Sequence, residues 1–318
     1  MSGFTVSGLT TYVRDNADDI QVAAITGAET LTYPGISIQA GIKNADRVML
    51  FANSAPFQQG TCAFNASGSS TFTERTLTVT KLKWQDTFCP EDLENKYLST
   101  KLIAGSNYDA MPFEKLIVDS VTANINFQME QAIWQGDTTL TNNVTLKQFD
   151  GWLKTIDAAS PTYATATANI TAANVIGIFD DVYKNVPTAL LNHPTKKLVA
   201  FCGWDTFRLL IIAIKDLNAF HYDAGAAAKT GEITLPGSGL SVKAVHGLDT
   251  ISGALASYAD RIVCTWPGNL FFGTDLESDK GDARFHYSAD DQNVKGSIKW
   301  KAGCQIAYGS EIVTYKNS

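Results

Sequence analysis

The sequence predicts an α+β protein whose strand-rich part is interrupted by a second domain, and three observations lead to this prediction. Residues 46–85 have the pattern of a long hairpin, and residues 112–136 have the pattern of one long amphipathic helix. Strand patterns then return over residues 283–315, after a stretch at 138–272 that alternates helix and strand signals. A chain of 318 residues is long enough for about two domains.

Composition excludes several classes of protein. The apolar content of 45% is ample for a core, whereas the charged content of 18% is low for a soluble monomer, where about 25% is typical. The net charge of −7 argues against a protein whose main role is to grip nucleic acid. The longest strongly apolar run, LLIIAI, is far shorter than the roughly 20 residues that span a bilayer. Five widely spaced cysteines without a CxxC motif indicate a reducing compartment.

The first 85 residues predict an arm followed by the hairpin. Residues 1–45 are rich in Thr, Gly and Ala and predict an extended arm with short structured pieces. One hairpin strand lies around residues 47–52, and the other is ERTLTVTKLKWQD. Between them lies an uncharged tip rich in Gly, Ser and Asn that is too long for a tight turn. The apolar residues change parity between Val79 and Leu82, which indicates a bulge or a strong twist at that point.

Two helices are predicted after the hairpin. Pro90 and Gly105 bound the first of them. Pro112 opens the second and Gly136 closes it, and at about 1.5 Å per residue it would be roughly 36 Å long, enough to span a domain. Its apolar residues recur at spacings of three and four: Phe113, Leu116, Ile117, Val121, Ile125, Met129, Ala132 and Ile133.

The rest of the chain predicts a second α+β domain and a return to strands. Residues 138–272 contain the buried-strand pattern KKLVAFC and a small-residue loop at 223–239 that we expect to be mobile. RFHYS and VKGSIKWK then alternate apolar and polar residues around the turn ADDQN. We expect a third strand to begin at Ile306.

Acidic residues at 275–279 have the spacing of a calcium loop but lack its other requirements. Asp275, Glu277 and Asp279 match the first, third and fifth positions of an EF-hand. Lys280 stands where the loop needs glycine, and His286 stands where it needs a bidentate glutamate. We therefore interpret the segment as a solvated acidic loop that precedes a hairpin.

Catalytic motifs are equally incomplete. AGAAAKTG has Ala228 where a phosphate-binding loop needs glycine before the lysine. FCGWD places Cys202 beside Gly and Trp, as in some cysteine nucleophiles, but none of the four histidines has a telling spacing. The sequence predicts no catalytic, cofactor or metal site and no enzyme activity. The alternative of another class is a cytoplasmic hydrolase that uses Cys202 or the acids at 275–279.

The order of elements, together with three segments, resembles the major capsid protein of tailed bacteriophages. The segments are WPGNLFFGTDLESD, RFHYSADDQNVKGSIKWKAGCQIAYGSEIV and LPGSGLSVKAVHGL. The resemblance implies the HK-ninety-seven-type capsid fold, with a discontinuous P-domain. It would divide the chain into an N-terminal arm (1–45), an extended E-loop hairpin (46–76), the first part of the P-domain (77–137) with its spine helix (112–136), an A-domain (138–272) and the P-domain return strands (273–318).

The resemblance also implies a function. It would make the chain a self-assembling shell protein that forms the hexamers and pentamers of an icosahedral capsid around double-stranded DNA. Its implied partners are a portal protein, a separate scaffolding protein, a decoration protein in some shells, and packaged DNA bound without sequence specificity, with no membrane. The implied location is the virion, after assembly in the host cytoplasm. An encapsulin-type compartment shell, which shares the fold, is the alternative.

The hairpin is the expected contact between subunits. A two-stranded arm of this length is marginally stable alone in water and exposes strand edges. Neighbouring subunits that cover the arm would remove both problems. The residues that we expect to make these contacts are Arg47, Phe57, Gln58, Gln59, Phe64, Phe72 and Arg75.

Overall fold

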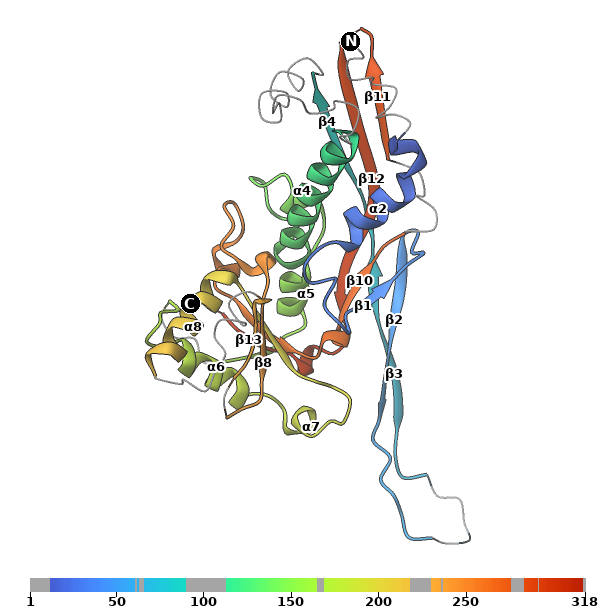
Figure 1. The fold of residues 1–318 in the computed structure, drawn as a ribbon. Coiled ribbons are helices and arrows are strands. Elements are labelled where there is room, and N and C mark those ends of the chain that lie inside the picture. Colours follow the sequence, from blue (N-terminus) through green and yellow to red (C-terminus); the bar gives the residue numbers. More distant parts are fainter. Residues whose placement is uncertain are drawn as a thin grey trace.

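A computed structural model shows two sheet-based halves and a hairpin that projects away from both (Figure 1). The α+β prediction is confirmed. The predicted helix at 90–105 lies outside the described residues. The structure describes residues 12–60, 62, 66–89, 113–164, 169–217, 230–235, 237–275, 283–290 and 292–316.

The first sheet is built around one long strand, β12 (Asn293–Ile306). β4 (Thr80–Phe88) and β11 (Arg284–Ser288) pair with its first part, both antiparallel. β10 (Leu270–Gly273) pairs with its last four residues, and β1 (Ser37–Gln39) runs parallel to β10. Segments from the first and the last third of the chain therefore meet in one sheet.

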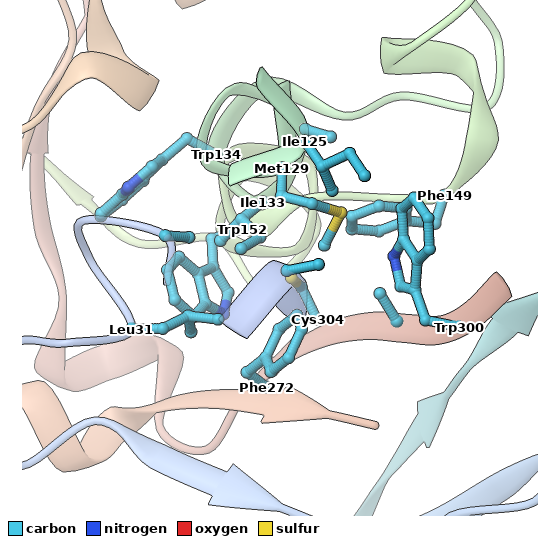
Figure 2. Close-up of a cluster of buried hydrophobic side chains, with 14 of the residues drawn as sticks. Leu31, Ile125, Met129, Ile133, Trp134, Phe149, Trp152, Phe272, Trp300 and Cys304 are labelled. Atoms are coloured by element: carbon cyan, nitrogen blue, oxygen red, sulfur yellow. The ribbon is translucent and has the colours of Figure 1, made fainter. Parts of the chain in front are cut away.

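Three helices pack against the first sheet. α4 (Phe113–Gln135) is the predicted spine helix, and its bounds agree with the sequence prediction to within one residue. α2 (Ala17–Thr26) packs against α4, and α5 (Trp152–Ala158) lies between α4 and β12. Figure 2 shows the core that they enclose, which contains Leu31, Ile125, Met129, Ile133, Trp134, Phe149, Trp152, Phe272, Trp300 and Cys304.

The second sheet has six strands and its own core. α6 (Val175–Lys184) and α8 (Trp204–Asp216) pack on it, α7 (Thr188–Leu191) precedes its fully buried strand β6, and short 3₁₀ turns join several of the elements. In spatial order its strands are β5 (Thr162–Tyr163), β13 (Val313–Tyr315), β9 (Ile262–Thr265), β6 (Val199–Cys202), β8 (Ser241–Ala244) and β7 (Glu232–Thr234).

The last strand lies elsewhere than the sequence predicts. No new strand begins at Ile306, because β12 runs without a break to that residue. The following strand, β13, joins the second sheet between β5 and β9, whereas the sequence prediction assigns it to the first. Conversely β10, most of which falls in the predicted A-domain segment, belongs to the first sheet. Alternation of apolar residues predicts a strand but does not identify the strand that it pairs with.

The arm contains more structure than its composition indicates. α2 buries Ala17, Ile20 and Ala24 against the first core. Two of these three residues are alanines, whose small apolar surface gives a weak periodic signal. The arm then supplies β1 to the edge of the first sheet, so much of it is part of the folded body.

The chain passes from the hairpin into the first sheet at Val79, close to the point where the sequence predicts a bulge or a strong twist. β3 (Ser70–Thr78) ends one residue before it and β4 begins one residue after it. Gly303 of β12 faces this point, and a Cβ at Gly303 would lie 2.0 Å from the carbonyl oxygen of Thr78. Glycine is therefore required at position 303, because any larger residue would prevent β12 from lying so close to the end of β3.

A buried carboxyl group fixes the arm to α4. Glu130 of α4 accepts hydrogen bonds from the backbone N–H and the hydroxyl of Thr30, the former at 2.8 Å, and from Trp134 Nε1 at 3.1 Å. Burial raises the pKa of Glu130 from 4.5 to about 7, and the nearby charge of Glu29 adds to the effect. The hydrogen bonds from Thr30 and Trp134 lower the pKa but do not cancel the cost of removing a charge from water.

We expect this group to make the subunit less stable as pH rises. Its pKa is higher in the folded chain than in the unfolded chain, so the folded state binds the proton more tightly. The free energy of unfolding should therefore fall between about pH 4.5 and pH 7, by at most about 3 kcal/mol. Urea unfolding across this range, compared with that of E130Q, measures the effect. An equal pH dependence in the variant would contradict the assignment.

Candidate inter-subunit surface

The hairpin is formed by β2 (Ala45–Asn53) and β3, which pair antiparallel over nine positions. Its far end extends well beyond the rest of the molecule (Figure 1). Most of its residues are exposed, including every described residue between Asn53 and Ser70. An isolated two-stranded ribbon is at best marginally stable in water, so a partner that covers it would stabilise it.

The base of the hairpin is anchored in the body. Val48 and Leu77 are buried in a small core with Ile42, Val79 and Ala307. Gln305 of β12 also donates a hydrogen bond from Nε2 to the carbonyl oxygen of Thr76, at 2.7 Å. These contacts fix the direction in which the hairpin leaves the first sheet.

The opposite face of the hairpin carries an exposed apolar cluster. Met49, Phe51 and Phe72 are 72%, 50% and 69% exposed. Phe51 and Phe72 are register partners, and their ring centroids lie 4.8 Å apart. We call these three residues the aromatic face. Neighbouring apolar side chains left in water in this way mark an interaction surface.

The two arginines expected to contact another subunit differ in their surroundings. Arg47 forms an ion pair with Glu74 across the hairpin, at 2.9 Å, and both side chains are well exposed. The pair balances the charge of Arg47 within the subunit and adds little stability, since solvent and salt screen it. Arg75 lies on the other face, opposite Val48, and is half-buried.

The tip contains the other predicted contacts. Phe57 is fully exposed, as are Gln58 and Gln59, whereas Phe64 lies outside the described residues. Sequence analysis missed Met49 and Phe51. The alternation of β2 places them on one face with Arg47, but that they share this face with Phe72 depends on the hairpin register.

The structure gives no further support to the calcium loop or the cysteine nucleophile, which the sequence supports only in part. Asp275 is buried and pairs with Lys301, and residues 276–282 lie outside the described part of the chain. Cys202 is buried in the core of the second sheet, where burial and the charge of Asp249 raise its pKa. A thiol in such a place stays protonated, unlike a catalytic thiolate.

Over the described ranges, no group of histidine, cysteine, aspartate and glutamate has the arrangement to hold a metal ion. No helix there is long and apolar enough to cross a membrane.

Comparison with solved structures finds this architecture in phage capsids. A chain of the satellite phage P4 procapsid, a structure that includes the size determination (Sid) protein, aligns with a TM-score of 0.62. The alignment covers 99% of this chain and 93% of that chain at 12% identity. The chain has the fold of a phage capsid subunit.

Two further capsids show the same fold. The capsid of Myoviridae phage XM1 aligns with a TM-score of 0.54 and 11% identity, over 89% of this chain and 90% of that chain. The capsid of an empty GTA particle aligns with a TM-score of 0.52 and 12% identity, over 89% and 88%. No family model and no curated protein matches the sequence. The HK-ninety-seven-type prediction is confirmed at the level of the fold.

Proposed function

We propose that the chain is the major shell protein of a tailed phage and that its hairpin joins neighbouring subunits. In this proposal it forms the hexamers and pentamers of an icosahedral capsid around double-stranded DNA. The observation that carries the proposal is the hairpin itself, which is anchored at its base by a small core and exposes an aromatic face on its opposite side. The fold shared with a chain of a phage procapsid over 99% of the sequence supports it.

The proposal includes further partners. A portal protein would occupy one vertex, a separate scaffolding protein would guide assembly in the host cytoplasm, and packaged DNA would be held without sequence specificity. A decoration protein is a further candidate, on the outer surface of the virion. An encapsulin-type compartment is the second candidate function, favoured only by the shared fold. The hydrolase alternative loses support because Cys202 is buried and Asp275 is paired with Lys301.

Analysis of purified particles distinguishes the two kinds of shell. We expect particles made with the neighbouring gene products to contain double-stranded DNA and a portal protein. Nuclease protection and mass spectrometry of the particles measure both. A single enzyme enclosed as cargo, in particles without DNA or portal, would identify an encapsulin-type compartment and contradict the proposal.

The aromatic face should contribute directly to assembly. In F51S/F72S two large apolar side chains are lost from the hairpin, while its strand register and the Arg47–Glu74 ion pair are kept. We expect at least tenfold fewer shells in sedimentation at equal protein concentration, because each subunit would bury less apolar surface against its neighbour.

The matched control is L217S, which removes an apolar side chain of similar exposure (68%) from the end of α8. This variant should assemble like the wild-type chain. Normal shells from F51S/F72S would show that the aromatic face has no role in assembly.

A further inference from the structure

The buried carboxyl group of Glu130 links the N-terminal arm to the spine helix through one residue of the arm, Thr30. Glu130 Oε2 accepts a hydrogen bond from the backbone N–H of Thr30, and Oε1 contacts the Thr30 hydroxyl. Trp134 Nε1 lies 2.8 Å from that hydroxyl oxygen and 3.1 Å from Oε1. All three side chains are buried, so this small polar network lies inside the first core.

The network can be satisfied without a charge on Glu130. A hydroxyl group either donates or accepts, so the acid O–H can donate to the Thr30 oxygen while the acid carbonyl accepts the Thr30 N–H. When the proton leaves, both hydrogen bonds remain, but a full charge is then held where water cannot reach it. Burial accordingly raises the pKa of Glu130 to about 7 in spite of these hydrogen bonds. Glu130 therefore changes its charge close to neutral pH.

The elements packed around Glu130 bring further titratable groups. The arm supplies Glu29, whose charge adds to the rise in the pKa of Glu130. β12 supplies the thiol of Cys304, whose pKa burial raises well above its usual value, so the thiol stays neutral near pH 7. A 3₁₀ turn beside α4 begins at His246, whose Nδ1 lies 3.0 Å from Asp249 Oδ2. A positive charge on His246 would thus be balanced by Asp249.

The arm is held on α4 mainly by small apolar side chains. Val13 is followed in α2 by two buried alanines and one isoleucine, and Ala28 and Leu31 flank the contact at Thr30. An alanine buries much less apolar area than a leucine and contributes correspondingly less to stability. Detaching residues 12–33 should therefore need less free energy than unfolding the whole subunit. β1 would remain paired with β10 in that state.

We propose that Glu130 and Thr30 form a proton-controlled latch, which holds residues 12–33 on α4 while Glu130 is protonated and releases them when it is ionised. Release brings water to the carboxylate, so the released state binds the proton less tightly than the docked state. Docking is therefore strongest below about pH 4.5 and weakens as pH rises to about 7. The inference goes beyond the proposed function, because the contact and its release both belong to a single free subunit.

Hydrogen exchange of free full-length subunits, measured by mass spectrometry, tests the latch. We expect the protection factors of the α2 amides to fall at least tenfold from pH 5 to pH 8, after correction for intrinsic exchange rates. E130Q should abolish this fall. The glutamine amide can donate to the Thr30 oxygen and accept from the Thr30 N–H, as the protonated acid does, and it never carries a charge.

The matched control is E29Q, which removes the neighbouring carboxylate and leaves Glu130 in place. Its amide oxygen can still accept the backbone N–H of His246, as Glu29 Oε2 does at 3.0 Å. The fall in protection of α2 should persist in E29Q, because burial, the largest cause of the raised pKa of Glu130, is unchanged.

Two results would overturn the latch. A fall in E130Q as large as that in the wild-type chain would assign the pH dependence to another group. Amides of α2 that are as well protected as those of the buried strand β6 at both pH values would show that the arm leaves only when the whole subunit unfolds. The second comparison needs only the wild-type chain, so it decides the matter even if E130Q does not fold.

Discussion

Replacing residues 54–69 by an Asn-Gly turn should give a folded subunit that does not form closed shells. Asn53 and Ser70 are register partners, so a two-residue turn can join them and close a shorter hairpin. The described part of the replaced segment is exposed throughout, and the base of the hairpin keeps its own core. The change therefore shortens the hairpin and leaves the rest of the subunit intact.

Two measurements on this variant separate folding from assembly. Its circular dichroism and Tm should match those of the wild-type chain, because the residues removed contribute no buried side chain among those described. Its sedimentation profile should contain free subunits or small rings and no shells. Shells of normal size would show that the tip has no part in joining subunits.

D157A should lower the free energy of unfolding by about 3–5 kcal/mol, because it leaves a buried guanidinium group without its counter-ion. The Arg261 side chain is completely buried, and its Nη2 lies 2.5 Å from Asp157 Oδ1. Asp157 belongs to α5 and Arg261 immediately precedes β9, so the pair joins a helix of the first core to a strand of the second sheet. Its loss should destabilise both halves of the subunit.

The matched control for this variant is D205A. Asp205 also pairs with an arginine, Arg208, at 2.8 Å, but both of these side chains are more than 60% exposed. Water and salt screen such a pair, so D205A should cost less than about 1 kcal/mol. Urea unfolding of the two variants tests the contrast, and equal losses would show that burial of Arg261 does not set the cost.

Local patterns in the sequence were sufficient for the elements that carry their own signal. The spine helix has regular apolar spacing and a closing glycine, and the change of parity after Val79 marks the passage from one sheet to the other. The buried run that ends at Cys202 is found as β6. In each case the residues that decide the structure are close together in the chain.

Features that depend on pairing between distant segments could not be predicted from local patterns in the sequence. β13 resembles any short alternating strand, and only the structure shows that it lies beside β9. The pairing of β4 with β12 joins segments about 200 residues apart in the sequence, and a slip of one residue would turn the buried side of β4 away from the core. The aromatic face likewise depends on Phe51 being opposite Phe72.

Electron microscopy of the purified wild-type chain, expressed alone and with its neighbouring gene products, tests the central claim most directly. The claim is that this subunit builds a closed shell through its hairpin. We expect hollow icosahedral particles with hexameric and pentameric units, in which the hairpin of each subunit lies on a neighbour. A chain that remains monomeric under both conditions, or particles in which the hairpin touches no other subunit, would contradict it.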